Sequence, residues 1–137
     1  MTHDQLADMV EGCPFHRFLG LKLEEFDEVA GRVSISVEAH EDLSRSDERV
    51  ELHGGVIASL IDLAGDYAVA LKVGQGVPTI GLNVDFLRFA RSAKVTATAS
   101  IVKCGRSIAV AEIRATDEAG SLIAIGRGTY SSVASAG

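Results

Sequence analysis

Two aspartates lie inside one of the most apolar stretches of the chain, LHGGVIASLIDLAGDYA at residues 52–68. Asp62 and Asp66 share a stripe with Ser59, because positions i, i+3 and i+7 fall on one face of a helix. A carboxylate in apolar surroundings is costly unless it is hydrogen-bonded or functional, and a second carboxylate nearby raises one of the two pKa values. The pair therefore indicates a general base or a nucleophile. The alternative is that this stripe is the solvated face of the helix.

The same helix is expected to begin with His53, Gly54 and Gly55. Glycine in a first turn lets a ligand or another backbone approach closely. The first N–H groups of a helix have no partner within it and lie at its positive end, so they can bind an oxyanion. The alternative is a tight turn into the helix, with His53 as an ordinary cap.

Spacing along the helix separates these two chemical groups. Gly54 and Asp62 are eight residues apart, which is roughly 12 Å at 1.5 Å per residue. An oxyanion donor and a base must both lie about 3 Å from one reacting carbonyl. Two antiparallel copies related by a two-fold axis satisfy this condition, because Gly54 of one chain then faces Asp62 of the other. The sequence therefore predicts an isologous dimer with two composite sites.

The surrounding pattern predicts one long helix and an antiparallel sheet. The helix runs over about 54–73 and ends at GQG, and a short amphipathic helix is expected over about residues 3–12. Residues 40–51 are polar and read as a loop. Consecutive strands joined by short turns imply antiparallel pairing, and the strands are expected at 19–29, 32–39, 79–89, 93–103, 107–116 and 121–131. We expect one domain over residues 1–137, with its core at about 19–131.

Composition restricts the classes of function. The net charge of −6 argues against nucleic acid as a partner. No apolar run approaches the roughly 18 residues that span a membrane, and the acidic N-terminus lacks the apolar region of a signal peptide. Cys13 and Cys104 have neither metal-site nor redox-motif spacing, so we expect no metal, two free thiols and a reducing, cytoplasmic location.

Charge is distributed unevenly between the two halves of the chain. Residues 1–75 hold 6 basic and 15 acidic residues, and residues 76–137 hold 7 and 4. A compact basic cluster on an acidic protein suits a small polyanionic ligand. The alternative is that strand edges and turns use these residues as solvated charges that prevent aggregation. The basic half includes Arg88, Arg91, Lys94, Lys103 and Arg106.

Three segments together resemble the hotdog-fold acyl-CoA thioesterases of the phenylacetate-pathway, PaaI-like type: HGGVIASLIDLA, the strand NVDFLRFA, and VKCGRS. The resemblance covers about residues 19–131. It implies an α+β hotdog fold, with a curved antiparallel sheet wrapped around one long helix, and a homodimer that assembles into a homotetramer. It also implies hydrolysis of an acyl-CoA thioester without a separate cofactor, since CoA is part of the substrate.

The resemblance carries over to individual residues. It implies that the Gly54 N–H polarises the thioester carbonyl, that the partner subunit's Asp62 is the base or nucleophile, and that His53 shapes the loop beside Gly55. Asp47 stands where the family often has asparagine, and Val50 where it often has glycine.

Further positions are candidates for binding the substrate. A family Ser/Thr in the strand after the helix aligns with Gly81, and Thr79 or Asn83, taken as lying on the same strand face, are candidate substitutes. Asp66 is expected to tune Asp62, and Gly65 to allow either close helix–strand packing or space for the acyl group. The candidates for contacts to the CoA phosphates are Arg88, Arg91, Lys103 and Arg106.

Two other functions remain open at this stage. A non-catalytic acyl-CoA-binding module would keep the basic residues but would not need Asp62. A hotdog hydratase or dehydratase would need a catalytic histidine in another motif, which His3, His16 and His40 do not supply.

Overall fold

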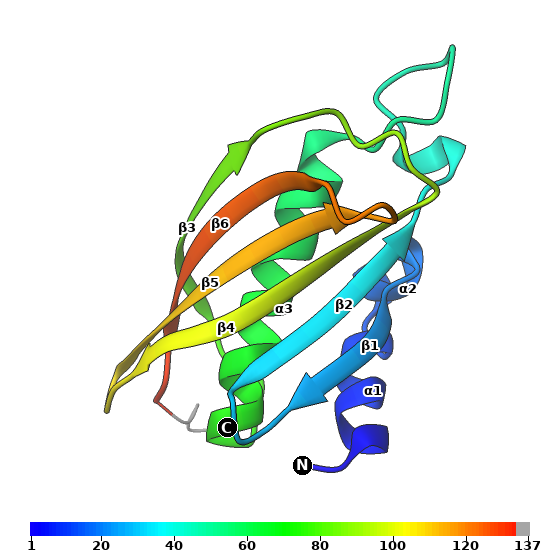
Figure 1. Ribbon diagram of the computed structural model, residues 1–137. Helices are drawn as coiled ribbons and strands as arrows, with labels where there is room; N and C mark the ends of the chain where they lie inside the picture. The colour runs from blue at the N-terminus through cyan, green and yellow to red at the C-terminus, as the bar shows by residue number, and fades with distance from the viewer. Residues whose placement is uncertain (134–137) are drawn as a thin grey trace.

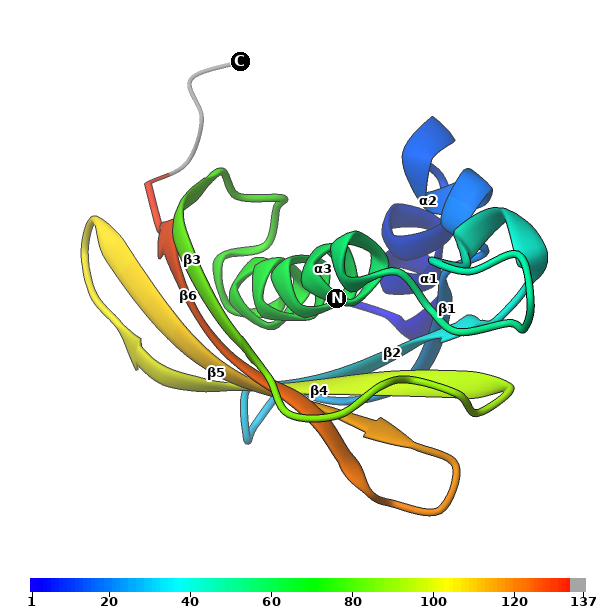
Figure 2. The same cartoon turned by 90° about the horizontal axis from the view of Figure 1, so that it is seen from above.

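The computed structural model describes residues 1–133. One curved antiparallel sheet wraps around a long helix (Figures 1 and 2). The sheet order is β1-β2-β4-β5-β6-β3. This is the α+β hotdog arrangement that the sequence predicts. The elements are α1 (His3–Glu11), α2 (Pro14–Leu19), β1 (Lys22–Asp27), β2 (Arg32–Glu38), a 3-10 turn (Glu41–Leu43), α3 (Gly54–Val73), β3 (Thr79–Phe86), β4 (Lys94–Cys104), β5 (Ile108–Asp117) and β6 (Leu122–Ser131).

Local sequence signals set both ends of α3, and the prediction of its range is confirmed. The His53 side chain caps the first turn. At the other end Gly74 adopts the left-handed conformation at φ 85° and donates its N–H to the Ala70 carbonyl, which is the usual use of glycine after a helix. The helix is nearly all apolar between these caps, and the sheet covers one side of it.

Small residues let the sheet approach the helix closely. The inward face of β4 and β5 is built mainly of alanine, and these side chains have no solvent exposure. Because alanine adds little bulk, the helix packs close to the strands, and its larger apolar side chains fill the remaining space. The buried alanines are Ala97, Ala99, Ala109, Ala111 and Ala115.

The structure differs from the sequence prediction around the N-terminal helices. Gly12 and Pro14 end α1, but Pro14 also begins a second helix, α2, because proline is well suited to a first helical position. Gly20, at φ 70°, ends α2. The predicted strand from residue 19 therefore starts only at Lys22. Among the described residues, none of the helices has both the length and the apolar composition needed to cross a membrane.

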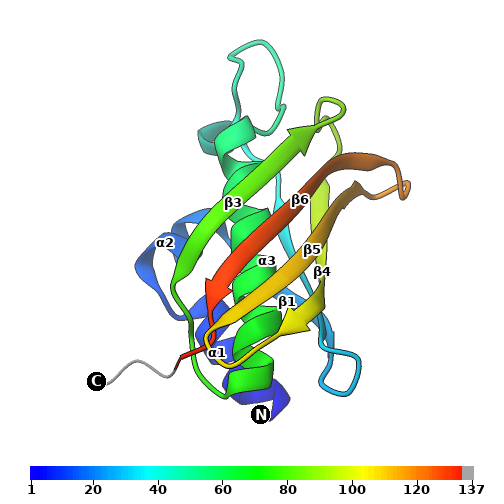
Figure 3. The same ribbon diagram turned by 90° about the vertical axis from the view of Figure 1, so that its left-hand side faces the viewer.

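The two edges of the sheet are different. The short helix α1 packs against β1, whereas β3 forms the opposite edge (Figures 2 and 3). Side chains along β3 are exposed, including Ile80 at 58%, Leu82 at 38% and Phe86 at 54%. An apolar edge strand of this kind is suited to pairing with another strand.

Candidate active site

The first turn of α3 presents one open backbone donor. The His53 Nδ1 accepts a hydrogen bond of 2.8 Å from the Gly55 N–H, so the neutral ring carries its proton on Nε2. Within residues 1–133, no acceptor is bonded to the Gly54 N–H. Gly54 therefore offers a donor at the positive end of the helix, whereas the Gly55 donor is already used. Ser59 is also engaged locally, because its hydroxyl donates to the Gly55 carbonyl.

Asp62 is held by the sheet from two directions. The Thr79 hydroxyl donates a 2.8 Å hydrogen bond to Oδ1 of the Asp62 carboxylate. The Tyr130 hydroxyl donates to the Asp62 backbone carbonyl at 3.0 Å. Thr79 and Tyr130 are partners across the β3–β6 ladder. One strand pair therefore holds both the side-chain carboxylate and the backbone carbonyl of Asp62. Asp62 remains partly exposed despite these contacts.

A β-bulge decides which strand residues reach Asp62. The register of β3 shifts between Thr79 and Gly81, so these two residues point to opposite faces. Gly81 pairs with Thr129, and Asn83 pairs with Arg127 and lines a cavity on the outer face of the sheet. The expectation that Thr79, Gly81 and Asn83 share a face is therefore wrong. Of the three, Thr79 contacts the carboxylate.

Asp66 is the carboxylate with the perturbed pKa. Burial raises its pKa to about 6, a hydrogen bond from the Val77 N–H opposes that shift, and the nearby charge of Asp62 adds to it. The sequence predicts one raised pKa in this pair, and the structure places it on the residue one turn beyond Asp62.

Gly65 and Gly128 make room for one tyrosine. A Cβ at either glycine would lie about 2 Å from the Tyr130 hydroxyl, at 2.0 Å and 2.1 Å respectively. Tyr130 belongs to β6, is fully buried, and reaches α3 with its hydroxyl group. Of the two explanations for Gly65, close helix–strand packing is therefore confirmed, and space for an acyl group at this glycine is wrong.

Two cavities flank the first turn of α3. The strand-side cavity, of about 350 Å³, includes Gly54, Phe86, Arg88 and Phe89 in its lining. The α2-side cavity, of about 260 Å³, is lined in part by His53, Gly55 and Phe18. Mainly apolar cavities with a few polar groups are typical of small-molecule sites. A larger cavity of about 550 Å³ lies on the outer face of the sheet and is lined by neither Gly54 nor Asp62.

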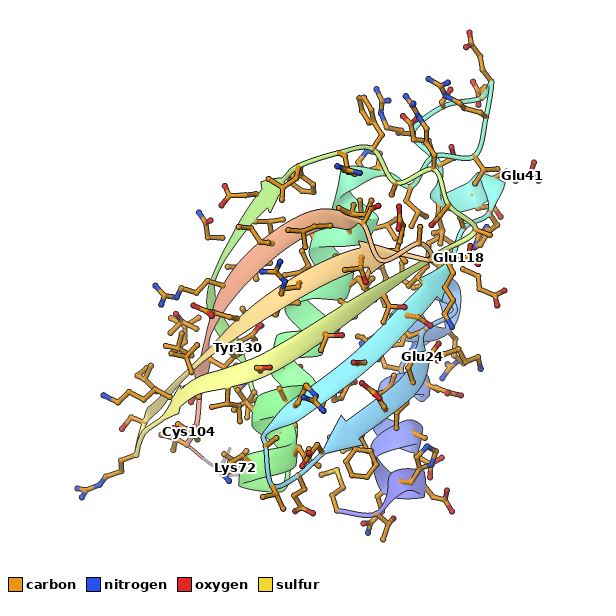
Figure 4. All side chains as sticks on the ribbon, viewed as in Figure 1. Glu24, Glu41, Lys72, Cys104, Glu118 and Tyr130 are labelled. Carbon is orange, nitrogen blue, oxygen red and sulfur yellow. The ribbon has the colours of Figure 1, made fainter. Side chains whose placement is uncertain are left out.

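The predicted phosphate contacts do not form one compact cluster in a single chain. Arg88 lines the strand-side cavity near the start of α3. Lys103 and Arg106 belong to the β4–β5 hairpin, at the opposite end of the sheet, where Cys104 is labelled in Figure 4. Lys103 lies nine positions after Lys94 along β4, a distance of roughly 30 Å. One chain therefore carries two basic regions.

Sequence reasoning missed the partners of Arg91, which lie in the loop at residues 40–51 that it treats as irregular. Arg91 donates its Nε–H to the Glu51 carboxylate at 2.6 Å, and Arg45 and Arg49 pair with the same carboxylate. The acidic and basic residues of this loop alternate closely, which is the only sequence signal of the cluster. Asp47, in the same loop, is exposed.

Residues 51–124 match the family model of the thioesterase superfamily, so the chain belongs to this superfamily. One relative is the medium/long-chain acyl-CoA thioesterase YigI of Salmonella typhimurium, which is 31% identical over 135 residues and covers 85% of this chain and 84% of its own length.

Solved structures support the same assignment. A thioesterase of Haemophilus influenzae superposes with a TM-score of 0.85 at 28% identity, covering 96% of this chain and 90% of its own. The PaaI protein of the Escherichia coli phenylacetic acid degradation operon shares the fold, with a TM-score of 0.81 at 24% identity and coverage of 92% and 88%.

Proposed function

We propose that the protein hydrolyses acyl-CoA thioesters to free CoA and a carboxylic acid. Gly54 of one subunit donates its N–H to the thioester carbonyl, and the partner's Asp62 acts as base or nucleophile. As a base, Asp62 takes a proton from the water that attacks the carbonyl carbon. The C–S bond then breaks, and the thiolate leaves and takes up a proton. As a nucleophile, Asp62 forms a mixed anhydride that water hydrolyses.

The observation that carries this proposal is the distance between an open backbone donor, the Gly54 N–H, and an oriented carboxylate, that of Asp62, on the same helix. The Gly54 N–H is open, and the Asp62 carboxylate is oriented by Thr79. Their spacing of roughly 12 Å along α3 is too long for one carbonyl to contact both. A two-fold axis that sets two α3 helices antiparallel brings each donor to the other chain's carboxylate.

The free edge at β3 supports this assembly. Ile80, Leu82 and Phe86 are exposed along it, and an antiparallel pairing of two β3 strands would cover them and continue the sheet. The dimer would then associate into a homotetramer. Acyl-CoA is the substrate class because the YigI relatives carry that name, and CoA enters as part of the substrate rather than as a bound cofactor.

The arrangement of histidines gives no support to a hydratase. The buried His16 bonds through Nδ1 to the Val10 carbonyl, and His53 caps α3. A binding module without catalysis would leave the Thr79–Asp62 pair without a role.

A thiol-release assay over a panel of acyl-CoA chain lengths and aryl-CoA thioesters tests the proposal. We expect turnover of at least one class, at rates well above those of the Asp62→Asn variant. A protein that binds acyl-CoA but releases no thiol from any member of the panel would favour the non-catalytic module.

A further inference from the structure

Glu51 is a carboxylate that water does not reach. Its side chain has no solvent exposure, and three guanidinium groups surround it, those of Arg45, Arg49 and Arg91. Arg91 donates its Nε–H to the Glu51 carboxylate at 2.6 Å, and Arg45 donates from Nη1. The Nε atom of Arg49 lies 3.4 Å from Oε2 of Glu51. We call these four residues the Glu51 cluster.

Backbone hydrogen bonds fix the position of this cluster. The Arg45 N–H donates to the Glu51 carbonyl at 2.9 Å, and the Ser44 hydroxyl receives the Glu51 N–H at 3.0 Å. The Leu52 N–H donates to the Ala90 carbonyl at 3.0 Å, which sets the segment that carries Arg91 beside the loop. Two segments about 40 residues apart therefore converge on one carboxylate.

The cluster holds more positive charge than Glu51 needs. Hydrogen bonds from Arg91 and then Arg45 keep the pKa of Glu51 below its usual value, so the carboxylate is ionised at neutral pH. One arginine would balance it, and three are present. The Glu51 cluster alone therefore carries two positive charges more than negative ones, and Asp47 and Glu48, exposed in the same loop, supply two negative charges outside it.

Most donors of the cluster point elsewhere than Glu51. Arginine carries five N–H donors, and within residues 1–133 the Arg91 side chain uses only Nε in hydrogen bonding. The side chains of Arg45 and Arg91 are 46% and 51% exposed. Both guanidinium groups lie over the Phe89 ring, at 4.9 Å and 5.1 Å from its centroid, and cation–π contact restricts them further.

This charged group adjoins the proposed active site. The strand-side cavity that contains Gly54 is also lined by Arg45, Arg88 and Phe89. A thioester carbonyl at Gly54 would therefore share its cavity with the guanidinium group of Arg45, which is held by Glu51 and by the Phe89 ring. Guanidinium groups with free donors are well matched to phosphate oxygens.

We propose that Arg45 and Arg91 form a binding subsite for a phosphate ester on the pantetheine arm of the substrate, and that Glu51 is the residue that positions them. This inference rests on the proposed function, because it assumes a thioester at Gly54. Two substrates carry this chemistry: CoA, with its diphosphate and 3′-phosphate, and the phosphopantetheine arm of a carrier protein.

The competing explanation is that the Glu51 cluster only stabilises the loop. The two explanations differ in substrate dependence. A phosphate subsite affects only thioesters that carry a phosphate, whereas loss of loop structure reduces hydrolysis of every thioester.

The test compares one acyl group on pantetheine, phosphopantetheine, dephospho-CoA and CoA. The variant Arg45→Gln/Arg91→Gln keeps most of the side-chain length and removes both charges. We expect its KM for the CoA thioester to rise about tenfold or more, with kcat within twofold and a weaker dependence of KM on salt. The pantetheine thioester, which has no phosphate, should show less than a twofold change in kcat/KM.

Glu51→Gln tests the positioning role. It leaves both arginines in place but removes their anchor, so KM for the CoA thioester should rise by a smaller factor, about threefold to tenfold. Glu51→Asp keeps the charge and should restore part of the loss. Arg32→Gln is the control for charge, because it removes an exposed arginine from the opposite end of the sheet (Figure 1).

The substrate at which KM first responds identifies the phosphate that is bound. If KM already rises with the phosphopantetheine thioester, the arm of a carrier protein could also be a substrate. If KM rises only with the dephospho-CoA or CoA thioester, the two arginines bind the nucleotide part of CoA. Equal losses with the pantetheine thioester, or no change with any substrate, would overturn the proposal.

Calorimetric titration with free CoA separates this inference from the proposed function. Wild-type protein should bind CoA, and the double arginine variant should bind it about tenfold more weakly. If no thioester is hydrolysed but this difference persists, the function is wrong and the subsite stands. If thioesters are hydrolysed and CoA binding does not depend on Arg45 and Arg91, the subsite is wrong and the function stands.

Discussion

The two halves of α3 differ in what they offer a ligand. The first turn is open: the Gly54 N–H has no acceptor within residues 1–133, and a cavity lies on each side of it. The middle of the helix is closed: Asp62 is bonded at its side chain and its backbone, and Gly65 is pressed against Tyr130. One end provides space and a donor, and the other provides an oriented carboxylate.

Under the proposed function, this contrast accounts for an aspartate within an apolar helix. A carboxylate that only solvated the helix would not need Thr79 and Tyr130 on both sides of it. In one chain the carboxylate cannot reach a carbonyl bound at Gly54, because roughly 12 Å of helix separates them. When two α3 helices run antiparallel, the open first turn of one helix faces the oriented carboxylate of the other.

The largest expected effect comes from removing the carboxylate. Asp62→Asn keeps the size of the side chain and should lower kcat by about 10² to 10⁴ without unfolding the protein, because it removes the base or nucleophile. Steady-state thiol release measures the loss, and circular dichroism with size-exclusion chromatography checks the fold and assembly. A rate close to that of the wild type would mean that the closed half is structural only.

Removing the donor at the open end should have the next largest effect. Gly54 is the first residue of α3, and His53 before it is extended at φ −60° and ψ 140°, so proline fits there without breaking the helix. Gly54→Pro should lower kcat by about 10², since it deletes the N–H.

Gly54→Ala is the matched control. It keeps the N–H, and its Cβ would meet the Phe86 ring at an ordinary 3.5 Å. Equal losses in the alanine and proline variants would point to crowding rather than to a lost donor.

A smaller effect is expected where β3 orients Asp62. Thr79→Val removes the hydroxyl that bonds to Oδ1 and should lower kcat about tenfold with little change in KM. Thr79→Ser keeps the hydroxyl and should retain most of the activity. If valine and serine variants behave alike, the Thr79 hydroxyl does not orient the catalytic group.

Asp66→Asn should have the smallest effect on activity, below about threefold, and a clear effect on stability. Because burial raises the pKa of Asp66 to about 6 from 3.8, the folded state binds a proton between these values that the unfolded state has lost. Wild-type stability therefore falls as pH rises through this window.

The stability gain of Asp66→Asn over wild type should accordingly grow by about 2–3 kcal/mol between pH 4 and pH 7. Denaturant unfolding at one protein concentration measures it. A gain that does not change with pH would contradict the raised pKa, and a loss of activity larger than that of Asp62→Asn would reverse the two roles.

The sequence was sufficient to predict α3 and its open end. The HGG start and the GQG end are local signals, and the stripe of Asp62 and Asp66 depends only on helical spacing. The pattern of strands and turns predicted the order of the elements, and the resemblance supplied the hotdog arrangement in which the sheet wraps around α3.

The contacts of Asp62 could not be predicted in the same way. A period-two pattern assumes an unbroken strand, so the bulge between Thr79 and Gly81 reversed the faces of the residues around it. The role of Tyr130 depends on pairing between β3 and β6, which are far apart in sequence. The Glu51 cluster joins two segments through one carboxylate, and in the sequence its charges look like those of any solvated loop.

Subunit mixing tests the shared site most directly. The Asp62→Asn and Gly54→Pro proteins, each shown to fold and dimerise, are unfolded and refolded together. In a composite site, each heterodimer has one site with both defects and one with neither. Random mixing makes about half of the dimers hetero, so activity should return to roughly a quarter of the wild-type level. A mixture confirmed to contain heterodimer but no more active than its two parents would contradict a site built from Gly54 of one chain and Asp62 of the other.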